Sequence, residues 1–182
     1  RQTVAQEEKE RTVEELLHTE GLLGMEVFSG DGIHVEQDRG FEMWDQVLSS
    51  GRRLWGFGND DFHHWGQERR VWNVVRAPQK TPEAILDAFR RGDFYVSTGF
   101  GFSKIISDDR SITFCLRDEP ELFRRAYRYL TLYGKDGQVL AEKTGHFQEF
   151  TYLVRGDEGY VRAEAYMNGG YGAFSQPIWI IS

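Results

Sequence analysis

The densest group of side chains that could do chemistry is the run Asp60-Asp61-Phe62-His63-His64, which follows a short apolar segment rich in glycine. In extended backbone, side chains two residues apart share a face, so Asp61 and His63 can point at one metal ion while Phe62 points away. A carboxylate with a neutral imidazole suits zinc, manganese or iron. The alternative is a polar loop in which an aspartate caps a backbone turn, and the five residues alone favour neither.

Two further side chains near this motif have a functional and a structural interpretation. His64 is placed to contact a substrate or to support a metal ligand, although the neighbour of a ligand is more often simply exposed. Arg69, with Arg70, could meet a phosphate group. A solvated charged loop is the more common setting for adjacent arginines.

The elements that must position this motif alternate between helix and strand. Helices are expected near residues 13–17 and 41–49 and from Pro82, after the N-cap Thr81, to the C-terminal Gly92. Strands are expected at residues 25–28, 54–57, 71–75 and 94–97. Alternation of this kind is typical of a parallel sheet or barrel with covering helices, so the predicted fold of residues 1–104 is a partial (βα) barrel. Residues 1–11 are polar and are expected to be disordered.

The second half of the chain has a different pattern. Strand-like runs that alternate apolar and polar residues are separated by turn sequences such as Lys135-Asp136-Gly137. This pattern predicts a small antiparallel β-sandwich over residues 105–182. The predicted strands cover residues 112–116, 129–133, 139–141, 147–154, 160–167 and 177–181.

Composition excludes several classes of function. The net charge is −7, and the basic residues form only short pairs, so no nucleic-acid surface is predicted. No apolar run approaches the roughly 20 residues that span a bilayer, and no signal peptide is recognisable, so a soluble protein without a membrane partner is expected. The single cysteine, Cys115, excludes an internal disulfide. The compartment is not fixed by these features.

The order of the motifs resembles a known family. The segments GLLGMEVFSG, WDQVLSSGRRLWGFGNDDFHHW and TPEAILDAFRRGDFYVSTGFG, with the ending AFSQPIWI, are similar to the C-terminal half of PHP-family metal-dependent phosphoesterases. The resemblance is strongest to the branch with an appended β-sandwich, and it covers residues 12–182.

The resemblance implies a distorted (βα) barrel that carries two or three divalent metal ions (Zn, Mn or Fe) and hydrolyses the phosphate ester of a small molecule. Asp61 and His63 match the last metal-binding motif of the family. Glu26 lies in a family-typical strand, where an orienting or hydrogen-bonding role is as plausible as metal binding. The family's earlier H-x-H motif has no counterpart here, and His18, His34 and His146 lack ligand spacing.

Because a catalytic zinc normally takes three protein ligands, the chain is expected to be the C-terminal fragment of such an enzyme. The fragment alone is expected to bind metal weakly or not at all and to have little hydrolase activity. Its exposed barrel edges would favour self-association. The alternative function is a non-catalytic module in which sandwich aromatics bind a saccharide or a protein. That hypothesis requires exposed, coplanar rings, with these candidates: Tyr152, Tyr160, Tyr166 and Trp179.

Overall fold

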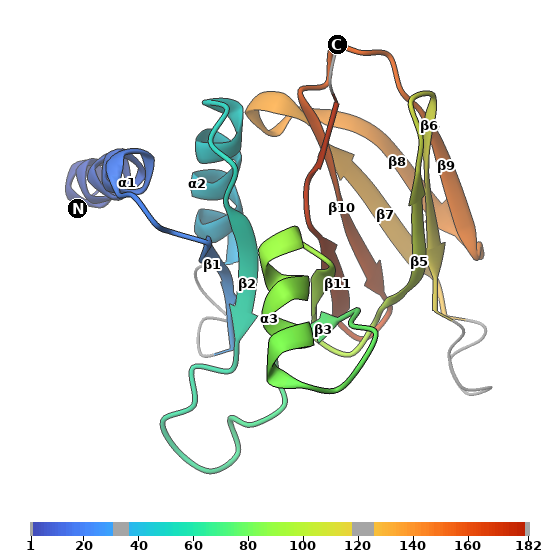
Figure 1. Cartoon of the computed structure of the whole chain (residues 1–182), viewed down its shortest axis with the longest axis horizontal. Coiled ribbons are helices and arrows are strands. Elements are labelled where there is room, and N and C mark those ends of the chain that lie inside the picture. The colour runs from blue at the N-terminus through green and yellow to red at the C-terminus, as the bar shows by residue number, and fades with distance from the viewer. Residues whose placement is uncertain (1, 31–36, 118–125, 181–182) are drawn as a thin grey trace.

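The computed structural model describes residues 2–30, 37–117 and 126–180, with side chains from residue 7 onwards and, after the first gap, from residue 40. Twelve strands in these ranges form three sheets, and three α-helices accompany them (Figure 1). The helices are α1 (Gln2–His18), α2 (Gln37–Ser49) and α3 (Pro82–Arg91), and a short 3-10 helix, η2, covers Lys135–Gly137.

The smallest sheet is a parallel pair, and the other two sheets are antiparallel. The pair consists of β1 (Gly24–Ser29) and β2 (Trp55–Asn59), joined through α2. The large sheet has the order β3 (Trp72–Val75), β4 (Phe94–Ser97), β11 (Tyr171–Ser175), β10 (Tyr160–Met167), β7 (Arg128–Tyr133) and β8 (Val139–Gly145), with β12 (Ile178–Trp179) also on β10. The third sheet has the order β5 (Phe102–Ser107), β6 (Ser111–Leu116) and β9 (Glu149–Leu153).

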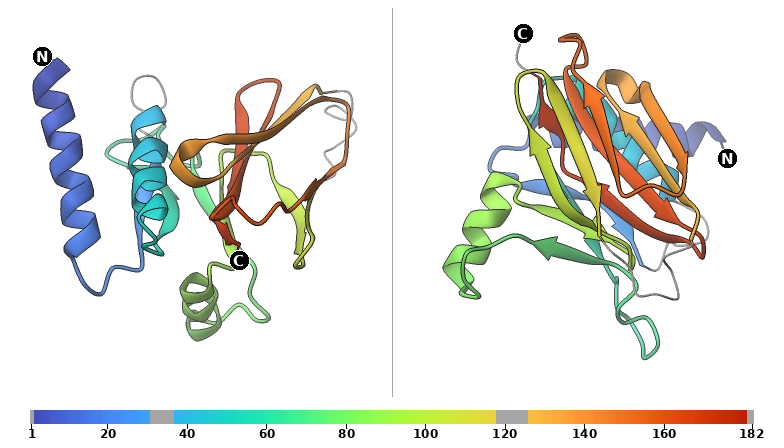
Figure 2. Two further views of the ribbon diagram at one scale, coloured as in Figure 1. Left: turned by 90° about the horizontal axis from the view of Figure 1, so that it is seen from above. Right: turned by 90° about the vertical axis from the view of Figure 1, so that its right-hand side faces the viewer.

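The large sheet is the central layer of the molecule, as the views in Figure 2 show, and β10 is buried on both of its faces. Successive side chains of a strand point to opposite faces. Val161, Ala163 and Ala165 therefore pack into the core that the large sheet shares with β5 and β6. Tyr160 points the other way, into a second core formed with α2 and β1. The near-continuous burial of β10 follows from these two apolar layers.

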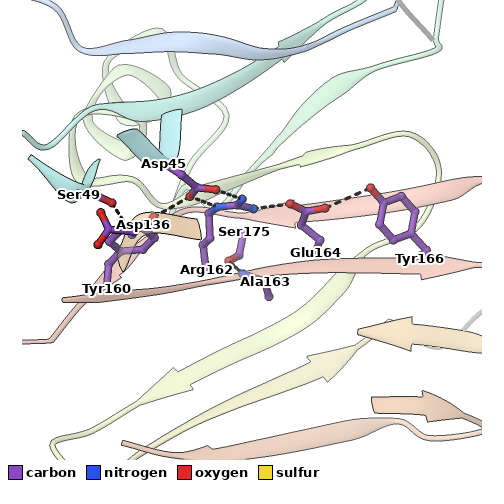
Figure 3. A network of polar contacts seen from close by, with 9 residues as sticks. All are labelled: Asp45, Ser49, Asp136, Tyr160, Arg162, Ala163, Glu164, Tyr166 and Ser175. Atoms are coloured by element: carbon purple, nitrogen blue, oxygen red, sulfur yellow. Dashed lines mark hydrogen bonds and ion pairs between the residues drawn. The ribbon is translucent and has the colours of Figure 1, made fainter. Parts of the chain in front are cut away.

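A buried ion network joins α2 to the α2-facing side of β10 (Figure 3). The Nε and Nη2 atoms of Arg162 donate to the two carboxylate oxygens of Asp45 at 2.8 and 2.6 Å, and Nη1 donates to Glu164 at 2.5 Å. The Tyr160 hydroxyl donates to Asp45 and the Tyr166 hydroxyl donates to Glu164. The Arg162 side chain is 2% exposed, and those of Asp45 and Glu164 are 10% and 11% exposed, so each charge in the network has an opposite charge as its protein partner.

The predicted partial (βα) barrel is wrong. Among the strands that the structure describes, only β1 and β2 pair in parallel, and β3 and β4 pair antiparallel with each other although α3 lies between them in the chain. Beyond β4 the sheet continues into β11, whose residues Ala173–Ser175 pair with Tyr95–Ser97. Alternating helices and strands indicate a barrel only when each helix returns the chain to a parallel neighbour. In this chain β4 instead lies between β3 and β11, and both pairings are antiparallel.

The polar N-terminal segment is helical rather than disordered, since α1 begins at Gln2. The end of α1 is anchored by burial, because Val13 is 8% exposed and packs against Val47 and Leu54. The guanidinium of Arg52 also donates to the backbone carbonyl of Leu17. Polar composition predicted disorder for residues 1–11, whereas tertiary contacts at the far end of the helix hold it in place.

None of the helices in the described ranges is long and apolar enough to cross a bilayer.

Candidate metal centre

The carboxyl ends of β1 and β2 lie side by side and carry the aspartate and histidine of the D-x-H motif. Ser29 is in register with Asn59, and the Gly30 N–H donates to the Asn59 carbonyl at 2.8 Å. A Cβ at Gly30 would lie 2.5 Å from the Asp60 carbonyl oxygen, so only glycine allows the segments that follow β1 and β2 to come this close. This contact places Ser29 next to the loop that begins at Asp60.

Asp61 and His63 are brought together by a turn rather than by extended backbone. Asp61 has φ of 51°, a left-handed conformation that aspartate tolerates better than most residues. The His63 Nδ1 lies 2.7 Å from the Asp61 backbone carbonyl and 3.5 Å from Oδ1 of the same residue. Because a carbonyl can only accept, Nδ1 carries the proton, and Nε2 keeps its lone pair. Histidine ligands in metal sites commonly use this arrangement.

Both side chains are accessible from solvent, with 65% of His63 and 45% of Asp61 exposed. The Ser29 hydroxyl donates to Oδ2 of Asp61 at 3.4 Å. One carboxylate, one imidazole nitrogen and one hydroxyl thus gather at the ends of the parallel pair. A carboxylate and an imidazole are donor types that divalent cations prefer, and two of them are fewer than a closed site needs.

The loop that follows β2 is organised by two side chains that accept backbone N–H groups. The Asp60 carboxylate accepts from Arg69, Arg70 and Val71 at 2.7–2.8 Å. Partial burial opposes its ionisation, but these N–H donors and the Arg70 charge outweigh burial and hold the pKa of Asp60 below its usual value. Asp60 therefore has the turn-capping role that was the alternative interpretation of the motif.

Gln67 is the second organiser, and its Oε1 accepts from the N–H groups of His63 and His64. The Gln67 side chain is buried although the loop around it is exposed. Two exposed rings, Phe62 and Trp65, form an edge-to-face pair nearby. The backbone that carries His63 is thus fixed by hydrogen bonds rather than by an apolar core.

Asp60→Ala is expected to loosen this loop, because three N–H groups lose a charged acceptor. The expected cost is about 1–3 kcal/mol of local stability. It would be measured as faster amide hydrogen exchange at Arg69, Arg70 and Val71. Asp109→Ala, which removes an exposed carboxylate elsewhere, is the matched control and should leave these amides unchanged.

The same interaction gives the loop a pH dependence with a defined sign. A carboxylate whose folded pKa lies below its unfolded value of 3.8 stabilises the fold above that value. The contribution is lost as the pH falls through the folded pKa. Exchange protection of the Val71 amide, corrected for intrinsic rates, should therefore drop in acid in the wild type. Asp60→Ala should lack this drop, and an identical drop in the variant would contradict the assignment to Asp60.

We call the Asp61–His63 pair at the end of β2 the metal corner. The other predicted site residues, Glu26, His64 and Arg69, do not bond to it. The Glu26 carboxylate accepts from Asn59 Nδ2 at 2.7 Å, a hydrogen-bonding role across the two strands. His64 is exposed, and its backbone N–H bonds Gln67. Arg69 is exposed with φ of 62°, and its backbone N–H bonds Asp60. Among the described residues, no side-chain hydrogen bond or ion pair joins Glu26, His64 or Arg69 to the Asp61–His63 pair.

Within the described ranges, no three His, Cys, Asp or Glu side chains come close enough together to hold a metal ion. His18 and His146 lie elsewhere, with His18 bonded to the Glu14 carbonyl in α1 and His146 against the Tyr127 ring. His34 is outside the described residues. Sequence reasoning missed Ser29 and Gln67, whose roles arise only once β1 and the loop meet.

The sandwich aromatics do not form an exposed platform. Tyr152 and Tyr160 are buried, and Tyr166 and Trp179 are half-buried. The Tyr152 hydroxyl donates to the buried Glu158, and burial with that hydrogen bond raises the pKa of Tyr152 to about 12. These four rings serve packing, which removes the reason for a saccharide-binding surface built on them.

Comparison with known proteins adds no family to this geometry: no family model, no curated protein and no solved structure matches the chain.

Proposed function

We propose that Asp61 and His63 are two ligands of a divalent metal ion in a hydrolase that acts on phosphate esters. The observation that carries the proposal is the hydrogen bond from His63 Nδ1 to the Asp61 carbonyl, 2.7 Å long, which fixes the ring and leaves Nε2 as the nitrogen that can bind a metal. The ordinary fate of an exposed imidazole is an unconstrained rotamer. Here the tautomer and ring orientation are set in advance.

The choice of phosphate esters as substrate rests on the resemblance of the D-x-H segment and its flanking helices to PHP-family phosphoesterases. A divalent metal in such a site lowers the pKa of a bound water and neutralises charge on the phosphoryl oxygens. The residues of this chain would hold the metal through Asp61 and His63, with Ser29 orienting the Asp61 carboxylate. The proposal does not require a (βα) barrel, since the corner is formed by one parallel pair of strands.

Two ligands give weak metal binding, and the remaining ligands of a catalytic site are not among the described residues. We therefore expect measurable but weak binding of Mn²⁺ or Zn²⁺ by the 182-residue chain and little turnover of p-nitrophenyl phosphate. The metal is the primary readout because it reports on the two residues directly.

The test is a titration of Mn²⁺ followed by paramagnetic broadening of amide resonances in the wild type and in variants Asp61→Ala and His63→Ala. Broadening should centre on residues 61–63, and each variant should weaken binding at least tenfold, which corresponds to about 1.4 kcal/mol. His18→Ala is the matched control, because His18 also has Nδ1 on a backbone carbonyl, that of Glu14, at 2.8 Å, in a helix away from the corner. It should leave the titration unchanged.

Binding that is equal in the wild type and in both corner variants would contradict the metal proposal. The phosphoesterase assignment has its own test in any longer natural form of the protein that turns over p-nitrophenyl phosphate. There, Asp61→Ala and His63→Ala should abolish metal-dependent hydrolysis. Activity that persists in both variants would rule out the catalytic role. The metal-binding result would be judged separately, from the Mn²⁺ titration.

A further inference from the structure

A groove of about 600 Å³ opens between the edge of β5, the β3–β4 pair and β12, and the first residue of β2, Trp55, also lines it. Its lining contains large apolar side chains, among them Trp55, Phe94, Phe102 and Pro177. Tyr95, Ile105 and Ile178 also pack against the core between the two antiparallel sheets. The groove is thus an opening into the flank of the sandwich.

One wall of the groove is a strand edge without a partner. In the described part of the chain, β5 pairs with β6 and with no other strand (Figure 1). The Asp108 N–H donates to the Ser111 carbonyl at the hairpin turn, so these two residues form a hydrogen-bonded pair. Along an antiparallel ladder, opposite residue pairs alternate between hydrogen-bonded and non-hydrogen-bonded. With Ile106 opposite Thr113, the backbone groups of Ile106 face β6. Those of Ile105 and Ser107 face away from β6, and both residues line the groove.

The rim of the groove is positively charged in a chain whose net charge is −7. Arg76, Arg91 and Lys104 line it with a single carboxylate, Asp93, which is paired with Arg91 at 2.8 Å. Arg76 and Lys104 are exposed, and no carboxylate among the described residues pairs with either. Two free cations therefore stand at an apolar opening. A ligand that carries both anionic and apolar groups would complement these two cations and the apolar side chains of the groove.

We propose that this groove binds an extended acidic segment of a partner protein by adding it as a strand to the β5 edge. The backbone of the segment bonds the outward N–H and C=O groups of Ile105 and Ser107. Side chains on one face of the segment enter the apolar groove, and acidic side chains meet Arg76 and Lys104. The inference is independent of the metal corner, since none of its residues belongs to that corner.

Strand addition is favoured over a small anion because the backbone N–H and C=O groups of Ile105 and Ser107 point away from β6. A small anion would use the cations alone and would leave the Ile105 and Ser107 edge exposed. Exposed edges with free donors are commonly blocked by charge, proline or a covering element. β5 carries one cation, the exposed Lys104, and no proline, so its edge is open to a partner strand of opposite charge.

The probe is a fluorescein-labelled peptide, acetyl-Gly-Glu-Val-Glu-Val-Glu-Ile-Glu-Gly-amide, titrated with the intact chain and followed by anisotropy. A peptide with lysine in place of each glutamate is the charge control. The acidic peptide should bind, and binding should weaken as salt is raised. Charge reversal at both rim cations, Arg76→Glu with Lys104→Glu, should weaken binding at least tenfold. The matched double variant Lys80→Glu with Lys143→Glu reverses two exposed cations outside the groove and should bind as the wild type does.

The edge itself is tested by Ser107→Pro, which removes an outward N–H without breaking the β5–β6 ladder. Binding should fall at least tenfold in this variant and stay unchanged in Ser107→Ala. Amide exchange gives a second readout: the Ile105 and Ser107 amides should become protected on peptide addition, and Ile106 should not change. Equal binding of the basic peptide, or full binding by Ser107→Pro, would overturn the proposal. The latter result, combined with a loss on charge reversal, would assign the groove to a small anion.

Discussion

Arg162→Met is expected to lower the free energy of unfolding by about 3–5 kcal/mol, because it removes one partner of a buried ion network and leaves the others without compensation. Methionine preserves most of the side-chain volume, so the loss reports on charge rather than on a cavity. Asp45 and Glu164 would each keep a tyrosine donor but lose the guanidinium that neutralises them. Urea denaturation followed by circular dichroism measures the change.

The surroundings of Arg162 make solvent a poor substitute for the lost charge. The guanidinium carbon lies 4.5 Å from the Tyr133 ring centre and 5.1 and 5.5 Å from those of Phe41 and Trp44. Burial raises the pKa of the Tyr160 and Tyr166 hydroxyls, with the adjacent carboxylates contributing, so both remain protonated donors. These rings cover part of the guanidinium surface.

Arg90→Met is the matched control, since Arg90 is 65% exposed and pairs with Asp87 within one helix. Exposed pairs of this kind contribute about 0.3–0.5 kcal/mol. A loss below about 1 kcal/mol in Arg162→Met would show that the network relaxes or fills with water. Variants of Asp45 are less informative because the Asp45 carboxylate also bonds Tyr160.

Local signals in the sequence were sufficient for elements whose ends are set by their own residues. α3 runs from Pro82 to Arg91 as predicted, with Thr81 Oγ accepting from the Ala84 N–H and Gly92 at φ of 75°. β10 also covers the residues predicted for it, 160–167. The caps of α3 directly flank the helix, and the alternation that marks β10 lies within the strand.

Two strands were not predicted, and one of them explains the error in the fold. β11 contains Gly172, and glycine weakens a strand assignment. A Cβ at Gly172 would lie 2.8 Å from the Phe174 ring, so the glycine is a packing requirement rather than a strand breaker. Without β11, nothing linked β4 to the antiparallel strands of the second half, and a parallel barrel was the simplest interpretation. β5 is mostly exposed and has no apolar alternation to reveal it.

The candidate site was predictable in its residue types and not in its geometry. Asp61 and His63 were expected to share a face of extended backbone, whereas the left-handed Asp61 produces their proximity through a turn. The supports of that turn, Asp60 and Gln67, act across four to eleven residues. Polar side chains in a polar loop carry no pattern that distinguishes such supports from solvated neighbours.

Gln176→Leu is the second substitution with a large expected effect, because one side-chain amide takes the place of a neighbouring strand along β2. Gln176 Oε1 accepts from the Gly56 N–H at 2.9 Å, and its Nε2 donates to the Gly56 carbonyl at 2.7 Å. Asn73 makes the same pair of bonds to Gly58. The edge of β2 that faces away from β1 is thus satisfied by two amides from distant parts of the chain.

Leucine matches glutamine in size but leaves both backbone groups of the buried Gly56 without a partner. Each unsatisfied group costs about 1–3 kcal/mol, so a loss of roughly 2–5 kcal/mol is expected. Denaturation in urea measures the loss, and faster exchange of the Gly56 amide locates it on β2. Gln138→Leu, at an exposed position, is the control and should change stability by less than about 0.5 kcal/mol.

The same substitution tests whether the metal corner depends on this edge. β2 ends at Asn59, one residue before the loop that carries Asp61 and His63, so loosening at Gly56 should propagate to the strand end as local opening. We expect weaker Mn²⁺ binding in Gln176→Leu even where the protein remains folded, and no change in Gln138→Leu. Unchanged metal binding with a fast-exchanging Gly56 amide would show that the Asp60 and Gln67 hydrogen bonds hold the corner without support from β2.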